Sequence, residues 1–541
     1  MISADIVLRN GNVLTLNGAA PPTRAVAIGN GRFIALGDDA EALIGSRTTV
    51  FDLGGRTAIP GLFDSHIHTV GGALNELAVS FERAASIADM QAALAARAAA
   101  VPPGTWIQGG SGWHESQLAE GRMPHRTELD AVAPDHPVFI RRGGHVVVVN
   151  SAALKIAGIT RRTPDPKDGV IGRDPDTGEP SGMLVEPSAF TLVLKHIPLP
   201  TRADYVEGLK RFTAKLNSRG VTSTLEPGVS LEEIAAYMEL WRQNAMTTRV
   251  RLLQKVTCID DVSALSSVLA PEFGNDWLRI GGFKYLADGG VEAAYLNEPY
   301  RIVEGEQNDP NFVGKLILPP GGIAELREML MTAAARGWQV QVHVVGDATI
   351  DAILGLIEEV AAKHPIADRR WTLMHVFLPS GAALARMKRL GLYATVQDHP
   401  VKLGHNMVRY WGEDRAARSI PVRSILDAGI PTGGGTDAPV VGWNPFESIW
   451  WMTTRQVHAQ GGIRVLGADE AIGREEALRL YTQGSAQTCF MEQSVGTIEP
   501  GKLADIAVLS ADPLKVADEE VRDVRACLTI VGGKVVHRDG L

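Results

Sequence analysis

Cysteine is scarce in this sequence, and its scarcity excludes a disulfide-built architecture. The chain of 541 residues has three cysteines, Cys258, Cys489 and Cys527, and no two of them form a Cys-x-x-Cys pair. Cysteines this few and this far apart in sequence do not indicate a framework of disulfide bonds. They are typical of a protein in a reducing compartment, and we therefore expect a cytoplasmic protein.

An excess of positive charge and long apolar runs are also missing. The 53 Lys and Arg residues are outnumbered by 62 Asp and Glu residues, which gives a formal net charge of −9. Nucleic acids and anionic membranes attract basic surfaces, so neither is expected as the main partner. Met1–Asp5 does not begin a signal peptide, and the densest apolar stretch, Val146–Val149, is far too short to cross a membrane. We expect a small-molecule partner, and the sequence is compatible with a homodimer.

Two catalytic signatures are absent as well. The glycine run Gly433–Gly435 is followed by Thr436 and Asp437, and the lysine of a phosphate-binding loop is missing. No Gly-x-Ser-x-Gly elbow occurs at a strand-to-helix turn. The sequence therefore gives no support to phosphate-loop nucleotide chemistry or to hydrolysis by a serine elbow.

The sequence does contain a regular alternation of apolar strands with helical patterns. Such alternation indicates a parallel sheet of βα units, and eight units are what a closed (β/α)8 barrel requires. We therefore predict an α/β fold with a (β/α)8, or TIM, barrel at its centre. The expected strands are 57–64, 221–225, 249–256, 278–286, 339–344, 371–376, 393–396 and 431–436.

Both ends of the chain have a different texture, with short apolar runs broken by Asn and Gly turns. This pattern predicts β-hairpins, and two isolated β pieces would each be marginally stable alone. We expect residues 1–57 and 487–541 to pair into one small β-sandwich domain. The barrel domain would then occupy residues 58–486.

A long interruption, at about 72–201, follows the first expected strand. Its apolar content marks it as an insertion with its own core and not as a linker. It includes a helical pattern at 87–100, a strand at 137–142 and a Pro-, Asp- and Gly-rich stretch at 163–182 that predicts a loop.

Ionisable side chains gather where the expected strands end. His66 and His68 lie two residues apart, so on a strand both would point to one side and could hold one metal ion. His343, His375 and Asp437 stand at the ends of three other expected strands, and the expected strand 278–286 passes through Lys284. Barrels of this kind carry their chemistry at the C-terminal ends of the strands. Several independent coincidences would be needed to place these residues there, so the pattern predicts a metal site.

These motifs resemble those of the amidohydrolase superfamily, and in particular the amidohydrolase 3 branch that includes N-substituted formamide deformylases. The resemblance extends over nearly the whole chain. One departure is Met374, which stands where a glutamate often precedes the histidine corresponding to His375. The motifs are the segment 60–68 (PGLFDSHIH), 143–145 with 150–151, 288–289, 343–347, 435–439 and 501–505.

The resemblance implies a site for two divalent metal ions, usually zinc, with Mn2+ or Fe2+ as alternatives. The implied ligands are His66, His68 and Asp437 for one ion, His343 and His375 for the other, and a carboxylated Lys284 as the bridge. A free ammonium group would repel a cation, whereas a lysine carbamate is an anion with two oxygens. The alternative for Lys284 is an ordinary lysine paired with a carboxylate such as Asp288.

Three further roles are expected around these ligands. Asp437 would move a proton from water to the leaving group, although an aspartate before Ala438 and Pro439 also fits a helix N-cap. His145 would contact the substrate carbonyl as a catalytic and substrate-binding residue, or else be a structural loop residue. Trp113 would line the substrate pocket, as would Trp106, unless both only pack. His399 and His405 follow the seventh strand and would border or merely cover the site.

The function predicted from these residues is metal-dependent hydrolysis of a C–N bond in an amide or formamide, by a metal-activated hydroxide. Ester, carbamate or lactone hydrolysis at the same site is an alternative. A mononuclear deaminase is another, although Val344, Val345 and Gly346 follow His343 where those enzymes place a glutamate. The alternative outside enzymes is an inactive barrel that serves as a binding protein.

Overall fold

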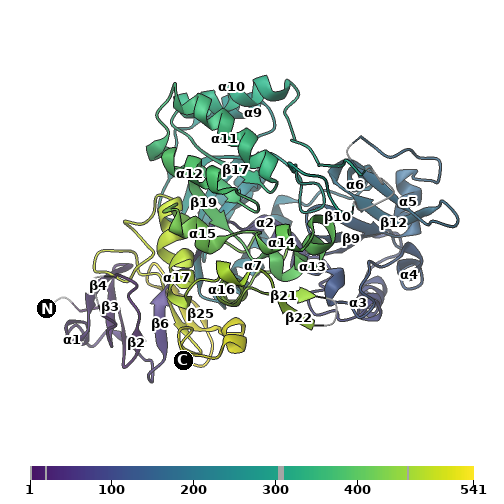
Figure 1. Cartoon of the computed structure of the whole chain (residues 1–541). Coiled ribbons are helices and arrows are strands. Elements are labelled where there is room, and N and C mark those ends of the chain that lie inside the picture. Colours follow the sequence, from purple (N-terminus) through teal and green to yellow (C-terminus); the bar gives the residue numbers. More distant parts are fainter. Residues whose placement is uncertain (1–2, 19–20, 168, 303–309, 460–461) are drawn as a thin grey trace.

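The computed structural model describes residues 3–18, 21–167, 169–302, 310–459 and 462–541. At its centre is a sheet of eight parallel strands in the order β20-β19-β18-β17-β16-β14-β13-β7 (Figure 1). The predicted α/β barrel is thus confirmed. The strands are β7 (Leu62–Asp64), β13 (Val221–Val229), β14 (Arg249–Lys255), β16 (Leu278–Leu286), β17 (Gln339–Val344), β18 (Thr372–His375), β19 (Tyr393–Val396) and β20 (Thr432–Gly434).

The barrel closes almost completely between its first and last strands. Ser65 N and Ser65 Oγ both donate to Gly434 O, over 3.0 Å and 2.9 Å. Helices cover the outside of the sheet (Figure 1). They include α7 (Arg202–Asn217), α8 (Leu231–Arg242), α9 (Ile259–Val268), α10 (Gly322–Ala335), α11 (Asp347–Ala361), α12 (Gly381–Arg389) and α15 (Val422–Asp427). Within the described ranges, none of the helices combines the length and apolar character that crossing a bilayer requires.

Helix α11 illustrates how the sequence fastens these helices to the sheet. Ile350, Ile353, Leu354 and Ile357 recur at helical spacing, and all four are buried. They share one apolar core with Val340 of the adjacent strand β17. Burying a side chain of this size stabilises the fold by about 1.5–3 kcal/mol. This packing fixes the positions of the strand ends that carry the polar residues.

The first expected strand, 57–64, is divided in two at Gly61. Strand β6 (Thr57–Pro60) pairs with β23 (Ile506–Leu509) from the C-terminal segment, whereas β7 enters the barrel beside β13. A Cβ atom on Gly61 would lie 2.2 Å from the side chain of Thr222, so a glycine is needed for the two segments to approach. The expectation of one continuous strand is wrong, because the chain changes sheets at this residue.

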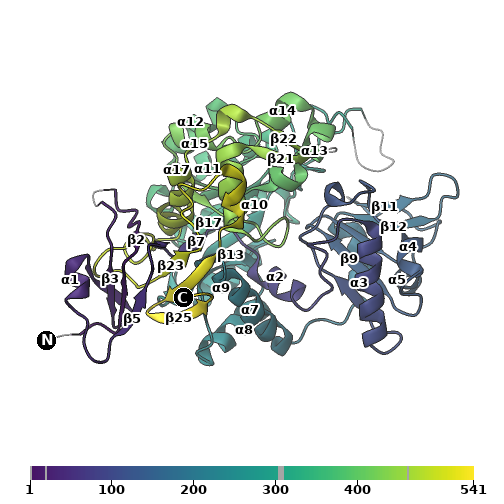
Figure 2. The same ribbon diagram turned by 90° about the horizontal axis from the view of Figure 1, so that it is seen from below.

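Both chain ends contribute strands to two further sheets. Their orders are β4-β3-β1-β5 and β2-β6-β23-β24-β25. Leu8 and Ile28 of the first sheet share an apolar cluster with Ile506 and Leu528 of the second. Figures 1 and 2 show both termini on the same side of the barrel. The proposed β-sandwich and its domain boundaries stay predictions. The remaining strands are β1 (Ile6–Arg9), β2 (Asn12–Val13), β3 (Val26–Gly29), β4 (Arg32–Leu36), β5 (Thr49–Asp52), β24 (Ala526–Val531) and β25 (Lys534–Arg538).

The segment between β7 and α7 builds a further sheet, on the opposite side of the barrel from the termini (Figure 2). Its order is β11-β12-β10-β9-β8. The helix expected at 87–100 is α3 (Ile87–Ala100), and the strand expected at 137–142 is β9 (Val138–Arg142). The other elements are β8 (Ile107–Gly109), β10 (Val146–Val149), β11 (Val170–Arg173), β12 (Pro180–Val185), α4 (Arg126–Asp130), α5 (Ser151–Ala157) and α6 (Pro187–Leu194).

The loop expected at 163–182 is wrong in part. Strand β11 and the start of β12 lie within it and pair antiparallel. Both strands are only partly buried, and glycine and proline occupy several of their positions, so the alternation that marks a strand is weak. Strand β12 pairs with β10, whose valines are all buried, and β11 pairs with β12, so the sheet stabilises both strands.

Candidate metal centre

The six polar residues that the sequence places at strand ends converge at one end of the barrel. Five of them line a cavity of about 320 Å³. The sixth, His66, is fully buried next to Asp437. The walls of this cavity include the apolar side chains of Trp113, Phe377 and Leu403. The five lining residues are His68, Lys284, His343, His375 and Asp437.

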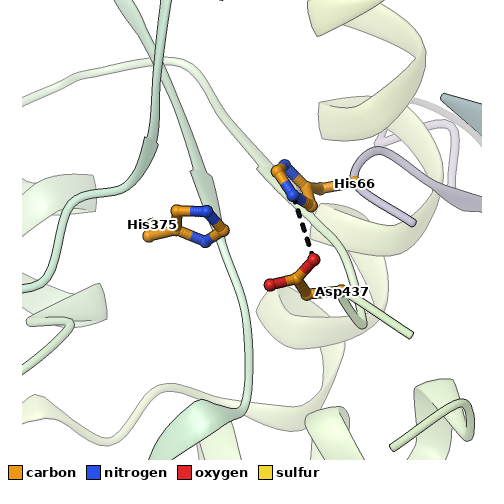
Figure 3. A group of neighbouring side chains, drawn as sticks. All are labelled: His66, His375 and Asp437. Atoms are coloured by element: carbon orange, nitrogen blue, oxygen red, sulfur yellow. Dashed lines mark ion pairs between the residues drawn. The ribbon is translucent and has the colours of Figure 1, made fainter. Parts of the chain in front are cut away.

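The tightest group consists of His66, His375 and Asp437, shown in Figure 3. Each offers one ligand atom, and these atoms all lie within 4.8 Å of one another. Asp437 Oδ1 lies 3.2 Å from His66 Nε2 and 3.3 Å from His68 Nε2. The ring centroids of His343 and His375 are 4.6 Å apart. Two imidazoles and a carboxylate at this spacing match the ligand chemistry of zinc and its neighbours.

The protonation states of these groups also suit a cation. Burial lowers the pKa of His66 to about 3 and holds the pKa values of His343 and His375 well below the usual range. The rings are therefore neutral at pH 7, which is the form that binds metals. Among the described residues, neither ring nitrogen of His66 nor Oδ1 of Asp437 has a hydrogen-bond partner. Buried polar atoms without partners are costly unless a ligand satisfies them, so the donor set fits a divalent metal ion.

Lys284 is buried in the wall of the cavity and has an unusual neighbour. Its Nζ lies 2.8 Å from Met374 Sδ, and in the described part of the chain it forms no ion pair. Burial lowers the pKa of Lys284 to about 7, an effect that nearby Asp437 opposes and Lys255 reinforces. Asp288, the carboxylate considered as its partner, lies just after β16 and instead accepts from Val345 N, in the turn after β17, over 3.1 Å.

The motifs at the first and last strands are joined by Asp64. Its carboxylate accepts hydrogen bonds from His66 N at 3.2 Å, from Thr436 N at 3.1 Å and from Thr436 Oγ1 at 2.7 Å. Asp64 thus fixes the segment that carries His66 against the segment that carries Asp437. Its burial explains why the aspartate belongs to the motif although it does not face the cavity.

Two of these residues have strained backbones. His375 has φ 73° and Asp437 has φ 55°, in the left-handed region that residues other than glycine rarely adopt. Such conformations cost about 1–3 kcal/mol each and are concentrated at functional sites. His375 is the last residue of β18, Asp437 follows β20, and both line the cavity.

The insertion supplies one wall of the cavity. His145 lines it, as do Gly143 and Gly144, and His145 Nδ1 lies 3.0 Å from Glu186 Oε2. Trp113 also lines the cavity and donates through Nε1 to Arg141 O at 2.8 Å. Trp106, by contrast, packs against a separate apolar cluster within the insertion.

Two residues contact the proposed ligands although the sequence does not indicate these contacts. His399 was expected to border or cover it, yet its Nε2 lies 2.8 Å from Asp437 Oδ2. Gln397 was not singled out, and its Oε1 lies 2.7 Å from His375 Nδ1. The only signal for either was a position just after the seventh strand. His405 is not among the residues that line the cavity.

A buried ionic network that joins the insertion to the barrel was also missed. Arg142 lies 2.9 Å from Glu292 and 3.1 Å from Glu115, and His114 adjoins Glu115 at 3.6 Å. Arg142 ends β9, His114 and Glu115 lie at the start of a short 3-10 helix, and Glu292 follows β16. These segments are not adjacent in sequence, and no local pattern predicts that they meet.

A parallel barrel with histidines and an aspartate gathered at the carboxyl ends of its strands is the architecture of a metal-dependent hydrolase. Residues 49–537 match the sequence model of the Amidohydrolase family. The chain therefore belongs to the amidohydrolase family and is a metal-dependent hydrolase.

Several known proteins are similar over nearly the whole length. The protein LONG AFTER FAR-RED 3 of Arabidopsis thaliana is 30% identical over 99% of this chain and 92% of its own length. The N-substituted formamide deformylase of Arthrobacter pascens is 28% identical over 98% and 97%. The crystal structure of an uncharacterized metal-dependent hydrolase from Pyrococcus horikoshii superposes with a TM-score of 0.74 at 26% identity, covering 95% of this chain and 99% of that one.

Proposed function

We propose that this protein hydrolyses a C–N bond in a linear amide or formamide, at a site for two divalent metal ions. The observation that carries the proposal is the cluster of His66, His375 and Asp437, two of which line a largely apolar cavity. The similarity to a protein named N-substituted formamide deformylase supports the choice of bond. The apolar walls favour a substrate with a bulky apolar group beside the scissile bond.

The ligands that would hold the metals are those the sequence motifs imply. His66, His68 and Asp437 would hold one ion, His343 and His375 the other, and Lys284, as a carbamate, would lie between them. When bound, the ions supply Lewis-acid chemistry and lower the pKa of a bound water. A carbamate forms from the uncharged amine, and the lowered pKa of Lys284 keeps that form populated near neutral pH.

The remaining steps fall to the side chains. Asp437 is ionised and can accept the proton of the attacking water and pass it to the leaving nitrogen. His145 lines the same cavity and can donate a hydrogen bond to the carbonyl oxygen. Trp113 and Phe377 provide flat apolar surfaces against which a ring can pack.

The test measures the metal content per chain and the hydrolytic activity of the same protein preparation. Protein purified without chelator should contain close to two divalent ions per chain, and His66→Ala should lose one ion and nearly all activity. The substrates are formanilide, acetanilide, a phenyl carbamate and phenyl acetate, which share the phenyl group and differ in the bond cleaved. We expect formanilide or acetanilide to be hydrolysed fastest. Full activity after the metal is stripped would refute the metal requirement, and a preference for phenyl acetate would refute the C–N assignment.

His145→Ala should lower turnover by about a hundredfold or more and leave the metal content unchanged, because a donor to the developing oxyanion contributes on this scale. Metal analysis and turnover on the best of the four substrates check the expectation. His196→Ala, on an exposed histidine just after α6, is the control and should behave as wild type. Unchanged turnover in the His145 variant would make His145 a structural residue.

A further inference from the structure

The loop that carries His145 is tied to a single residue of the insertion, Glu186. Glu186 N donates to His145 O at 2.7 Å, and His145 Nδ1 lies 3.0 Å from Glu186 Oε2. Glu186 lies between the end of β12 and the start of α6, two elements anchored in the insertion's own core. One residue thus holds both the backbone and the ring of His145.

The backbone of Glu186 is itself strained. Its φ of 67° and ψ of 154° belong to a region that is essentially reserved for glycine. A glutamate persists there only if the surrounding structure imposes the conformation, and outliers of this kind are concentrated at active sites and ligand clamps. Here the conformation accompanies the double contact with His145.

The contact leaves one nitrogen of the ring for a ligand. With Nδ1 engaged by the carboxylate, Nε2 is the ring nitrogen that remains for a ligand. His145 lines the metal-site cavity. Glu292, Arg142 and His343 also interact electrostatically with His145, and Arg142 is already bound by Glu292 and Glu115. Burial alone would lower the pKa of His145, but Glu186 outweighs it and raises that pKa to about 9.

We propose that Glu186 is a positioning residue that holds His145 in the cavity as a charged donor, with Nε2–H directed at a substrate oxygen. The inference rests on the proposed function and deepens it, because it identifies the group bound at this wall as an oxygen that is, or becomes, negatively charged. A charge-assisted hydrogen bond of this kind is stronger than one from a neutral ring. The leaving nitrogen would then lie on the Asp437 side of the cavity.

The first test needs no substrate. The protonation of His145 is followed in protein labelled with 15N-histidine, and the signal is assigned by its loss in His145→Ala. In Glu186→Gln the pKa should fall well below the wild-type value of about 9, because burial and Arg142, which lower it, are then opposed by Glu292 alone. Glu179→Gln, just before β12 and away from the cavity, is the matched control and should leave it unchanged. An unchanged pKa in Glu186→Gln would overturn the proposal, even if none of the four substrates is hydrolysed.

The second test asks whether Glu186 acts through His145. On the best of the four substrates, Glu186→Gln should lower kcat by about 10- to 100-fold, as loss of an orienting partner does, with little change in KM or metal content. Combined with His145→Ala it should cause no further loss, because the two changes remove one interaction. The ratio of wild-type to Glu186→Gln turnover should also rise from pH 6 to pH 8, as the variant ring loses its proton. Additive effects, or a ratio independent of pH, would overturn the proposal.

A second variant, Gly290→Ala, tests the position of the His145 ring if Glu186→Gln does not fold. A Cβ atom on Gly290 would lie 2.9 Å from His145 Cδ2, 3.1 Å from His145 Nε2 and 3.2 Å from Glu292 Oε2. Gly290→Ala should therefore displace the ring of His145 without a close contact to Glu186. It should lower kcat and leave the thermal midpoint and metal content close to wild type. Normal turnover in a folded Gly290→Ala variant would show that the ring position does not matter.

Discussion

Asp437→Asn is expected to lower turnover by about 10²- to 10⁴-fold while much of the metal stays bound, because the amide keeps an oxygen but cannot carry a proton. Burial would raise the pKa of Asp437, but the facing rings of His66, His399 and His375 hold it well below its usual range. The carboxylate is therefore ionised at neutral pH and able to accept a proton. Steady-state turnover on the best of the four substrates and metal analysis of the same sample measure the two effects.

His399 offers a check on this assignment. Its Nε2 lies 2.8 Å from Asp437 Oδ2, the oxygen that does not face His66 and His68. His399→Ala should therefore reduce turnover less than Asp437→Asn does, since it removes a partner of the carboxylate and not the carboxylate itself. Asp427→Asn on the exposed side of α15 is the matched control. Near-normal turnover in Asp437→Asn would move the proton transfer to another residue.

Lys284→Ala is expected to lose at least about 100-fold in activity, more than outer partners of a metal site usually contribute. Added acetate or propionate should restore part of the turnover, because a short carboxylate can occupy the space of the lost carbamate. The carbamate itself should appear in the 13C spectrum of wild-type protein exchanged with 13C-bicarbonate.

Lys255 provides the matched control for that rescue. It pairs with Lys284 across β14 and β16 and also lines the cavity, but the motifs do not include it among the ligands. Carboxylates should raise the turnover of Lys284→Ala and not that of Lys255→Ala. Equal rescue of both variants, or a free lysine at position 284 in a metal-loaded crystal structure, would exclude the bridging role.

The barrel could be predicted from the sequence because its strands are buried on both faces. Gln339–Val344 and Thr372–His375 are buried throughout, and apolar helices follow them, so the local pattern and the tertiary structure agree. The change of sheet at Gly61 could not be predicted, because the apolar run continues through it. The clash that requires this glycine involves Thr222, which is far away in the sequence.

The site, like the fold, has features that could be predicted from the sequence and features that could not. The histidines could be assigned to strand ends from the sequence, because strand periodicity shows where each strand ends. In a barrel the C-terminal strand ends lie together, so these histidines are expected at one site. The contacts of Glu186 with His145 and of His399 with Asp437 arise between segments that only the folded chain brings together. The binuclear occupancy, the carbamate and the roles of Asp437, His145 and Trp113 stay predictions, because they depend on chemistry and not on position.

The pairing of β6 with β23 has a consequence for how the protein is made. Ile59 emerges early from the ribosome, but its partner Ala507 is synthesised only when the chain is nearly complete. Until then the strand that leads into His66 and His68 has an unpaired edge, a condition that slows folding and promotes aggregation. We therefore expect the metal-binding histidines to reach their final positions only after translation ends. A transcript truncated before β23 would yield a chain that contains all six proposed ligands and cannot assemble them.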